Sequence, residues 1–275
     1  MKVLVYQSHV KQHDNRPFRH ELAIASRESF QKYAEKHGYD YRCDEKAWIK
    51  PLEQSGHTKF FYAMQGLAPS DYDYVIYADS DVIASANSPA FPLKDGFSGI
   101  SQINGYANAV RTPEITEKQK VWVYNHLKAY GIEDHEYLNT GVWSVCRETR
   151  NHIWNTWRSI RKKCKEPELN GVLLDQPVIN ACIYNRKINH LSWKWNAISD
   201  VLQPSLYEQA YFIHYGGLLG SIIWKAPRFL GQPNVLRERV GQILFNSFCS
   251  DMGRYGKLPL KEAVTEIINK QFNHG

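Results

Sequence analysis

Short apolar runs and amphipathic stretches alternate in the first part of the chain. Residues 3–6 form an apolar run that predicts a strand, and residues 21–36 carry apolar side chains at the spacing of one helical face. Gly38 follows at the position where many helices end in a left-handed residue, and residues 39–42 resume as an extended segment. This strand–helix–strand order predicts an α/β domain built on a mostly parallel sheet flanked by helices.

The clearest strand of the sequence is residues 74–78, an apolar run that ends abruptly at the polar residues 79–81. Further strands are predicted at residues 98–103, 141–145, 188–191 and 211–213. Further helices are predicted at residues 59–66, 116–130 and 149–165, and from Asp175, which can cap a helix that has proline in its first turn.

The pattern shows no internal repeat and no clear linker. We expect one domain over residues 1–230, followed by a helical extension over residues 231–275 that packs on the same domain. The extension carries an apolar stripe at Leu260, Val264, Ile267, Ile268 and Phe272. Packing against the domain is the favoured interpretation of this stripe, and a contact with a membrane surface or a second copy is the alternative.

Composition narrows the class of protein. Hydrophobic residues make up 43% of the 275-residue chain and charged residues 23%, which allows a sizeable core and excludes wholesale disorder. The formal net charge of +6 is mildly basic, so it suits a phosphate-bearing partner and is too weak to indicate nucleic acid.

Cysteine spacing and apolar run lengths bear on the compartment. The five cysteines form no Cys-x-x-Cys pair, which argues against a zinc site or a disulfide scaffold and favours a reducing compartment. No stretch approaches the ~20 apolar residues of a membrane span, and the first residues lack the features of a signal peptide. We therefore expect a cytoplasmic protein, with peripheral attachment to a membrane as the alternative.

The sharpest chemical feature is the tripeptide Asp79-Ser80-Asp81 at the end of the 74–78 strand. Ligands of open α/β sheets bind beyond the carboxyl ends of strands, and two carboxylates one residue apart can share Mg²⁺ or Mn²⁺ with a diphosphate. The tripeptide is common, and aspartate also caps turns and helices. Its placement favours the metal interpretation, because two unpaired carboxylates at a buried strand end would repel each other.

Several segments occur in an order typical of one enzyme family. They are residues 33–39, Lys59, residues 74–81, Leu-Asn-Thr-Gly-Val at 138–142, Leu-Asp-Gln-Pro at 174–177 and Ile-His-Tyr-Gly-Gly at 213–217. Together they span roughly residues 1–227 and resemble metal-dependent nucleotide-sugar glycosyltransferases of the GT-A fold, above all the retaining galactosyl-, mannosyl- and xylosyltransferases and the glycogenin-like enzymes. The resemblance implies a Rossmann-like GT-A sheet with a C-terminal helical appendage.

The resemblance implies a cation site made of Asp79, Asp81 and His214. Imidazole suits Mn²⁺ better than Mg²⁺, so Mn²⁺ is the favoured cofactor and Mg²⁺ the alternative. A histidine after an apolar strand is more often a core residue. Bare backbone at Gly216 and Gly217 weakens that interpretation, because it can approach a phosphate closely.

Further residues are expected around the nucleotide. Tyr6 and Ser8, at the end of the first strand, would lie beside the base and ribose. Lys59 would meet the nucleotide or its diphosphate as a point charge, and a plain surface lysine is the alternative. Ser80, Gly216 and Gly217 complete this expected set.

Four residues of the later motifs are expected near the transferred sugar. Asn139 and Thr140 begin a strand that would face the cleft, with ordinary turn chemistry as the alternative role. Asp175 would bind hydroxyls of the donor sugar while capping its helix. Gln176 would lie opposite the leaving group, and because an amide oxygen is a poor nucleophile it favours same-face attack over a covalent intermediate. Asp175 and Gln176 are thus the candidate catalytic residues.

The expected function is transfer of a hexose or pentose from a nucleotide-diphosphate sugar, with UDP favoured over GDP, to a saccharide or glycoconjugate acceptor. A sugar nucleotidyltransferase is one alternative, although such enzymes normally carry a glycine-rich loop after the first strand and residues 7–11 contain no glycine. A non-catalytic module that binds carbohydrate or nucleotide sugar is the other, and the 13% aromatic content would suit it.

Overall fold

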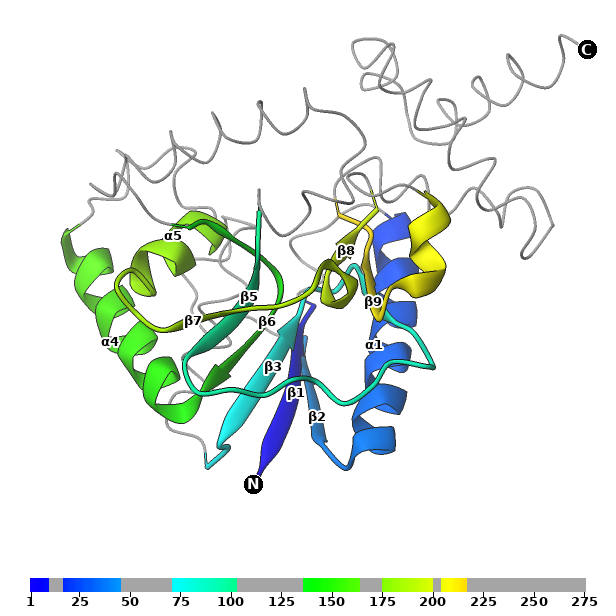
Figure 1. Ribbon diagram of the computed structural model, residues 1–275, viewed down its shortest axis with the longest axis horizontal. Coiled ribbons are helices and arrows are strands. Elements are labelled where there is room, and N and C mark those ends of the chain that lie inside the picture. The colour runs from blue at the N-terminus through cyan, green and yellow to red at the C-terminus, as the bar shows by residue number, and fades with distance from the viewer. Residues whose placement is uncertain (10–16, 46–70, 103–135, 164–174, 200–203, 217–275) are drawn as a thin grey trace, which may run out of the picture.

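The computed structural model describes residues 1–9, 17–45, 71–102, 136–163, 175–199 and 204–216. Within these residues the chain is organised around a six-stranded sheet with the strand order β2-β1-β3-β6-β5-β7 (Figure 1). The strands are β1 (Val3–Ser8), β2 (Asp40–Asp44), β3 (Tyr74–Ala78), β5 (Phe97–Ser101), β6 (Leu138–Cys146) and β7 (Ile188–His190).

Strand direction confirms the expected mostly parallel sheet. β1 pairs in parallel with β2 and with β3, and β5 pairs in parallel with β7. Among these six described strands β6 alone runs antiparallel to both of its neighbours, β3 and β5. The carboxyl ends of β1 and β3 therefore meet at one edge, beside the amino end of β6.

Helices cover both faces of this sheet (Figure 1). α1 (Pro17–His37) packs on one face, and α4 (Arg147–Lys163) and α5 (Asp175–Cys182) pack on the other. Because successive strand residues point to opposite faces, Val5 belongs to the cluster beneath α1 and its neighbour Tyr6 to the cluster beneath α4 and α5. The fold is thus a three-layer α/β arrangement.

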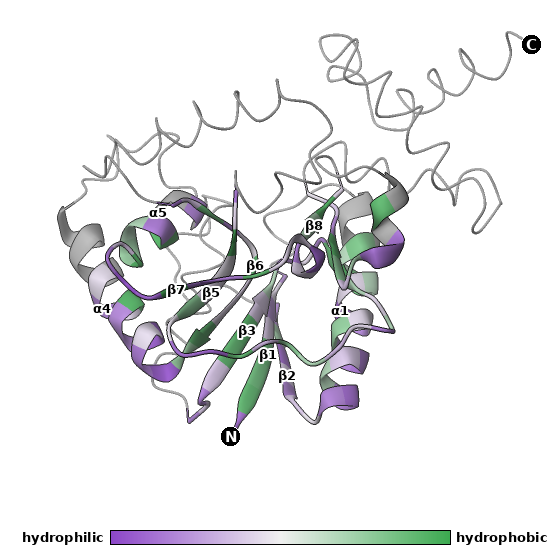
Figure 2. Cartoon of the chain, viewed as in Figure 1, coloured by the Kyte–Doolittle hydropathy of each residue, from purple (hydrophilic) through white to green (hydrophobic). Residues whose placement is uncertain are grey.

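Burial on both faces explains the continuous apolar run of β3. Val75, Ile76, Tyr77 and Ala78 are each at most 1% exposed, as expected for a strand that is covered on both sides. Figure 2 shows β1 and β3 mostly in the colour of hydrophobic residues, while α1 and α4 carry hydrophilic patches.

A second, smaller sheet was not expected from the sequence. It contains β4 (Val82–Ala84), β9 (Phe212–His214) and β8 (Ala197–Ile198), in the order β4-β9-β8. β4 begins directly after Asp81, so this sheet starts where β3 ends. Two short 3₁₀ helices, Trp193–Trp195 and Pro204–Gln209, precede β8 and β9.

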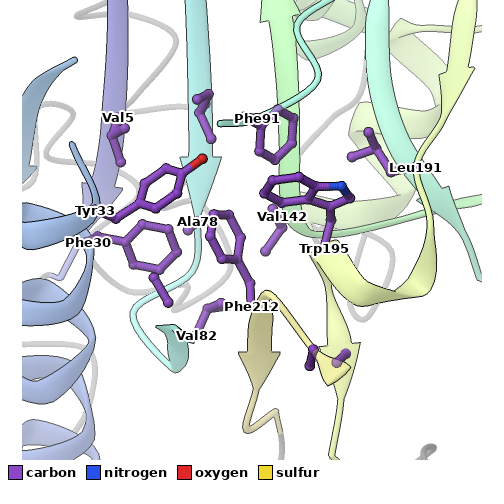
Figure 3. Close-up of a cluster of buried hydrophobic side chains, with 14 of the residues drawn as sticks. Val5, Phe30, Tyr33, Ala78, Val82, Phe91, Val142, Leu191, Trp195 and Phe212 are labelled. Atoms are coloured by element: carbon purple, nitrogen blue, oxygen red, sulfur yellow. The ribbon is translucent and has the colours of Figure 1, made fainter. Parts of the chain in front are cut away.

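Aromatic packing joins the small sheet to α1. The ring centroid of Phe212 lies 4.9 Å from that of Phe30, 5.0 Å from that of Tyr33 and 5.2 Å from that of Trp195. Figure 3 shows these rings gathered between α1 and the small sheet. Phe212 is completely buried, so this cluster fixes β9, and with it His214 two residues later.

Most predicted elements are present with shifted ends. α1 begins four residues before the expected start at residue 21, and β6 begins three residues before the expected start at residue 141. Gly38 has a φ of +66°, which confirms the left-handed helix end.

Three predicted helical segments, residues 59–66, 116–130 and 231–275, lie outside the described residues. The domain boundary at residue 230 likewise stays a prediction. In the part of the chain that the structure describes, no helix combines the length and hydropathy that crossing a membrane requires.

Candidate metal centre

Asp79 and Asp81 lie in the tight turn between β3 and β4. The backbone N–H of Val82 donates to the carbonyl oxygen of Asp79 (3.1 Å), which closes the turn. The Asp79 N–H donates to the carbonyl oxygen of Gly141 on β6 (2.8 Å), and the Asp81 carbonyl oxygen accepts from the N–H of Tyr215 (2.8 Å). The backbone of the acidic turn is therefore held by β6 on one side and by the segment after β9 on the other.

Strand pairing brings His214 to this turn. β9 runs antiparallel to β4 with His214 opposite Val82, the residue that follows Asp81. The Nε2 atom of His214 lies 3.3 Å from Oδ1 of Asp81, and the two side chains are 10% and 21% exposed. An imidazole nitrogen and a carboxylate oxygen thus face each other in a largely buried setting.

Asp79, Asp81 and His214 each place one ligand atom within 4.8 Å of the other two. Two carboxylates this close repel each other when partly buried, and a cation between them relieves the repulsion. Carboxylate oxygens and an imidazole nitrogen are donors that a divalent transition-metal ion accepts. The three residues that the sequence analysis grouped therefore form one spatial cluster whose chemistry fits a divalent cation.

A buried tyrosine orients one of the carboxylates. The Tyr77 hydroxyl donates to Oδ1 of Asp79 at 2.7 Å. The Tyr77 ring is 1% exposed and stacks on Trp143 with centroids 4.9 Å apart, so the hydroxyl has a fixed position. Tyr77 therefore holds the Asp79 carboxylate in place without itself contributing a ligand atom to the cluster. This role was not predicted from the sequence.

Replacing Tyr77 with phenylalanine is expected to lower Mn²⁺ affinity by about 10-fold, because groups that orient ligands typically contribute that much or more. Calorimetric titration with Mn²⁺ measures the change. Tyr74→Phe is the matched control, because its hydroxyl makes a bond of the same length, 2.7 Å, to Asp95 at the other end of the same strand. Equal Mn²⁺ affinity in the two variants would show that Tyr77 does not support the cluster.

Two glycines lie against the imidazole of His214. A Cβ on Gly141 would come within 2.2 Å of Cε1 and 2.4 Å of Nδ1, and a Cβ on Gly216 would come within 3.1 Å of Nε2. Position 141 in the Asn-Thr-Gly motif must therefore be glycine, because any side chain there would clash with the His214 imidazole. Gly216, expected beside a phosphate, contacts the same ring.

An irregularity in β6 places the Asn-Thr-Gly motif. Between β5 and β6 the partners shift from Ser98 opposite Ser144 to Ile100 opposite Asn139, so β5 advances two positions while β6 covers five. Extra residues of this kind bend a strand and re-aim its side chains. Asn139 and Thr140 are 7% and 3% exposed, within the strand rather than at an open turn.

Gln176 reaches the same motif from α5, which begins at Asp175. Its Oε1 atom accepts from the N–H of Thr140 at 3.3 Å, and its Nε2 atom donates to Oε1 of Gln102 at 3.4 Å. The candidate catalytic amide is thus held next to the strand that also carries Gly141. Asp175 is placed by its backbone at the first position of the helix.

Comparison with solved structures identifies the architecture. A glycosyltransferase involved in the glycosylation of the major capsid of PBCV-1 superimposes with a TM-score of 0.52 at 16% identity, over 79% of this chain and 94% of that one. The chain has the GT-A fold. The galactosyltransferase LgtC, solved in complex with donor and acceptor sugar analogs, gives a TM-score of 0.47 at 12% identity over 79% of this chain and 87% of that one. The sequence matches no model of a known protein family and no curated protein.

The first strand of the GT-A sheet carries two further predicted residues. Tyr6 is completely buried, and its hydroxyl donates to Oδ2 of Asp44 at 2.8 Å. Burial, reinforced by the Asp44 carboxylate, raises the pKa of Tyr6, so this hydroxyl stays protonated as a donor. Ser8 is 1% exposed, and among the described atoms its Oγ has no hydrogen-bond partner. Tyr6 therefore orients Asp44, while Ser8 offers an unused hydroxyl at the strand end.

Of the three remaining predicted residues, Ser80 lies within the described part of the chain. Ser80 is the half-buried central residue of the acidic turn. Lys59 and Gly217 lie outside the described residues.

Sequence reasoning missed two residues of the site in addition to Tyr77. Gln102 at the end of β5 and Asn196 before β8 both bond to Asn139. Neither residue belongs to a recognisable motif, and only the folded arrangement of β5, β6 and the small sheet brings them to Asn139.

Proposed function

We propose that this protein is a cation-dependent glycosyltransferase that moves a hexose or pentose from a nucleotide-diphosphate sugar, with UDP as the nucleotide, to a saccharide or glycoconjugate acceptor. The observation that carries the proposal is the cluster of Asp79, Asp81 and His214 at the carboxyl end of β3 in a GT-A fold. Ligands of open α/β sheets bind at this edge. The capsid-glycosylating enzyme with the same fold supports sugar transfer as the class of reaction.

Asp79, Asp81 and His214 would hold Mn²⁺, with Mg²⁺ as the alternative. When bound, the cation would neutralise the charge that develops on the leaving nucleoside diphosphate. Ser8 is assigned to the nucleotide because its hydroxyl is buried without a partner among the described atoms. Tyr6, Lys59, Ser80, Gly216 and Gly217 complete the assigned nucleotide-binding set.

Gln176 is assigned to the face of the donor sugar opposite the leaving group, and Asp175, Asn139 and Thr140 to sugar hydroxyls. An amide oxygen is too weak a nucleophile to form a covalent glycosyl intermediate. Its dipole can stabilise positive charge on the anomeric carbon. We therefore assign retention of configuration by same-face attack, in which the departing phosphate oxygen accepts the proton of the acceptor hydroxyl.

A screen of nucleotide sugars with Mn²⁺ tests this function. The expected result is release of the free nucleoside diphosphate from one UDP-sugar, accelerated by an acceptor saccharide and abolished by a chelator. Restoration of release when Mn²⁺ is added back controls for damage by the chelator.

Two other results would contradict the proposal. Metal-dependent binding of the donor without release of nucleoside diphosphate, over a broad panel of acceptors, would identify a binding module. Release of pyrophosphate from a nucleoside triphosphate and a sugar 1-phosphate would identify a nucleotidyltransferase.

A further inference from the structure

A chain of side-chain amides connects the imidazole of His214 to Gln176. His214 Nδ1 lies 3.0 Å from Oδ1 of Asn196, and Asn196 Nδ2 donates to Oδ1 of Asn139 at 2.6 Å. Asn139 Nδ2 donates to Oε1 of Gln102 at 2.8 Å, and the same oxygen accepts from Nε2 of Gln176 at 3.4 Å. The three linking residues, Asn196, Asn139 and Gln102, are 0%, 7% and 8% exposed. Water therefore has little access to these bonds.

A backbone N–H fixes the direction of the bonds near His214. The Gly141 N–H, which can only donate, points at Oδ1 of Asn139 at 2.9 Å. Because the same oxygen lies 2.6 Å from Asn196, that residue must present its NH₂ group there. The carbonyl oxygen of Asn196 then faces Nδ1 of His214, and an oxygen acceptor requires a proton on that nitrogen.

The opposite end of the chain has its own backbone anchor. The Thr140 N–H donates to Oε1 of Gln176 at 3.3 Å, which turns the Gln176 NH₂ group towards Gln102. The Gln102 oxygen then accepts from the NH₂ groups of Gln176 and Asn139, whose orientations are fixed by the two backbone N–H groups. Both anchors lie in the Asn-Thr-Gly segment of β6, and they require the same set of amide orientations.

We propose that Asn196 is a positioning residue that holds His214 in the Nδ1-protonated tautomer. The unprotonated Nε2 nitrogen then faces Asp81 and can serve as a ligand for a divalent cation. Nε2 is the nitrogen that lies 3.3 Å from Asp81 Oδ1. Metal-bound histidines typically donate their other N–H to an oxygen that fixes the ring in this way. The same amide chain sets the orientation of Gln176, and this second part rests on the proposed function.

The tautomer of His214 is measured directly by ¹⁵N NMR of the metal-free full chain, in a series of rising pH that is followed until the ring has lost one proton. The eleven histidines are distinguished by the signal that disappears in His214→Gln. The expected spectrum has a protonated Nδ1 and an unprotonated Nε2. An Nε2-protonated ring would overturn the proposal without any effect on whether the protein transfers sugar.

Variants of Asn196 test the consequence for the metal. Asn196→Leu removes the acceptor, and we expect loss of the single tautomer and a fall in Mn²⁺ affinity of about 10- to 100-fold. Asn196→Asp keeps an oxygen acceptor for Nδ1 and is expected to retain the Nδ1 proton, although it loses the NH₂ group that donates to Asn139 Oδ1. Asn189→Leu is the control, because Asn189 bonds to the Asp95 carbonyl oxygen at the opposite edge of the sheet.

The readouts separate this proposal from the proposed function. Wild-type Mn²⁺ affinity in a folded Asn196→Leu protein would overturn the positioning role, whatever the enzymatic activity. The protein could show the expected tautomer and the expected affinity loss but turn over no nucleotide sugar. That result would support the positioning role and contradict the proposed function. If Asn196→Leu does not fold, the tautomer of the wild-type ring still decides.

Discussion

Asp81→Ala is expected to abolish Mn²⁺-dependent release of nucleoside diphosphate while the fold survives. Asp81 supplies one of three ligand atoms that lie within 4.8 Å of one another. A metal that neutralises transition-state charge contributes several kcal/mol, and about 4 kcal/mol corresponds to roughly a 1,000-fold loss of turnover. Initial rates of nucleoside diphosphate release, together with calorimetric Mn²⁺ titration, measure both effects.

The isosteric change Asp81→Asn separates charge from shape. Asparagine retains an oxygen but loses the negative charge, so we expect it to resemble Asp81→Ala in Mn²⁺ affinity. The metal-free variant should melt no lower than the metal-free parent, because repulsion between Asp79 and Asp81 is removed. Asp95→Asn, an exposed carboxylate at the opposite edge of the sheet, is the control. Unchanged activity and metal affinity in Asp81→Asn would show that the site is assigned wrongly.

Gly141→Ala is expected to disrupt the metal centre although Gly141 supplies no ligand. The new Cβ would lie 2.2 Å from Cε1 of His214, closer than two carbon atoms can approach without displacement. The ring or β6 must therefore shift, at a cost of about 1–3 kcal/mol in the free energy of unfolding. Movement of His214 is expected to lower Mn²⁺ affinity by about 100-fold, the upper end for residues that orient a ligand.

Calorimetry and thermal unfolding of this variant give the two quantities separately. Gly38→Ala is the matched control, because Gly38 has a φ of +66° but open space where the new methyl group would lie. It should lose stability through backbone strain, roughly 1 kcal/mol, and keep its Mn²⁺ affinity. Equal Mn²⁺ affinity in Gly141→Ala and the parent would contradict the contact between β6 and the imidazole.

The main sheet could be predicted because its strands carry strong local signals. The 74–78 run predicted β3 with its observed bounds, since burial on both faces makes every position apolar. The two- and three-residue strands β8 and β4 were missed because such short segments carry only a weak local signal, although the three-residue strands β7 and β9 were predicted. The antiparallel direction of β6 is likewise set by its neighbours and not by its own residues.

The same contrast holds for the site. Asp79 and Asp81 could be predicted from one strand end, and His214 from its resemblance to a family motif; the structure brings the three together. Gln102 and Asn196 could not be found, because a buried amide looks like any polar residue until its partners are placed. The reason for Gly141 was also missed, since its contact with His214 joins segments far apart in the chain.

A crystal grown with Mn²⁺ and UDP and measured for the anomalous signal of manganese would locate the cation. We expect one strong peak at roughly 2.0–2.4 Å from carboxylate oxygens of Asp79 and Asp81 and from Nε2 of His214, with diphosphate oxygens in the remaining positions. A peak elsewhere, or a lysine or arginine side chain in contact with the two carboxylates in place of the ion, would contradict the proposed site.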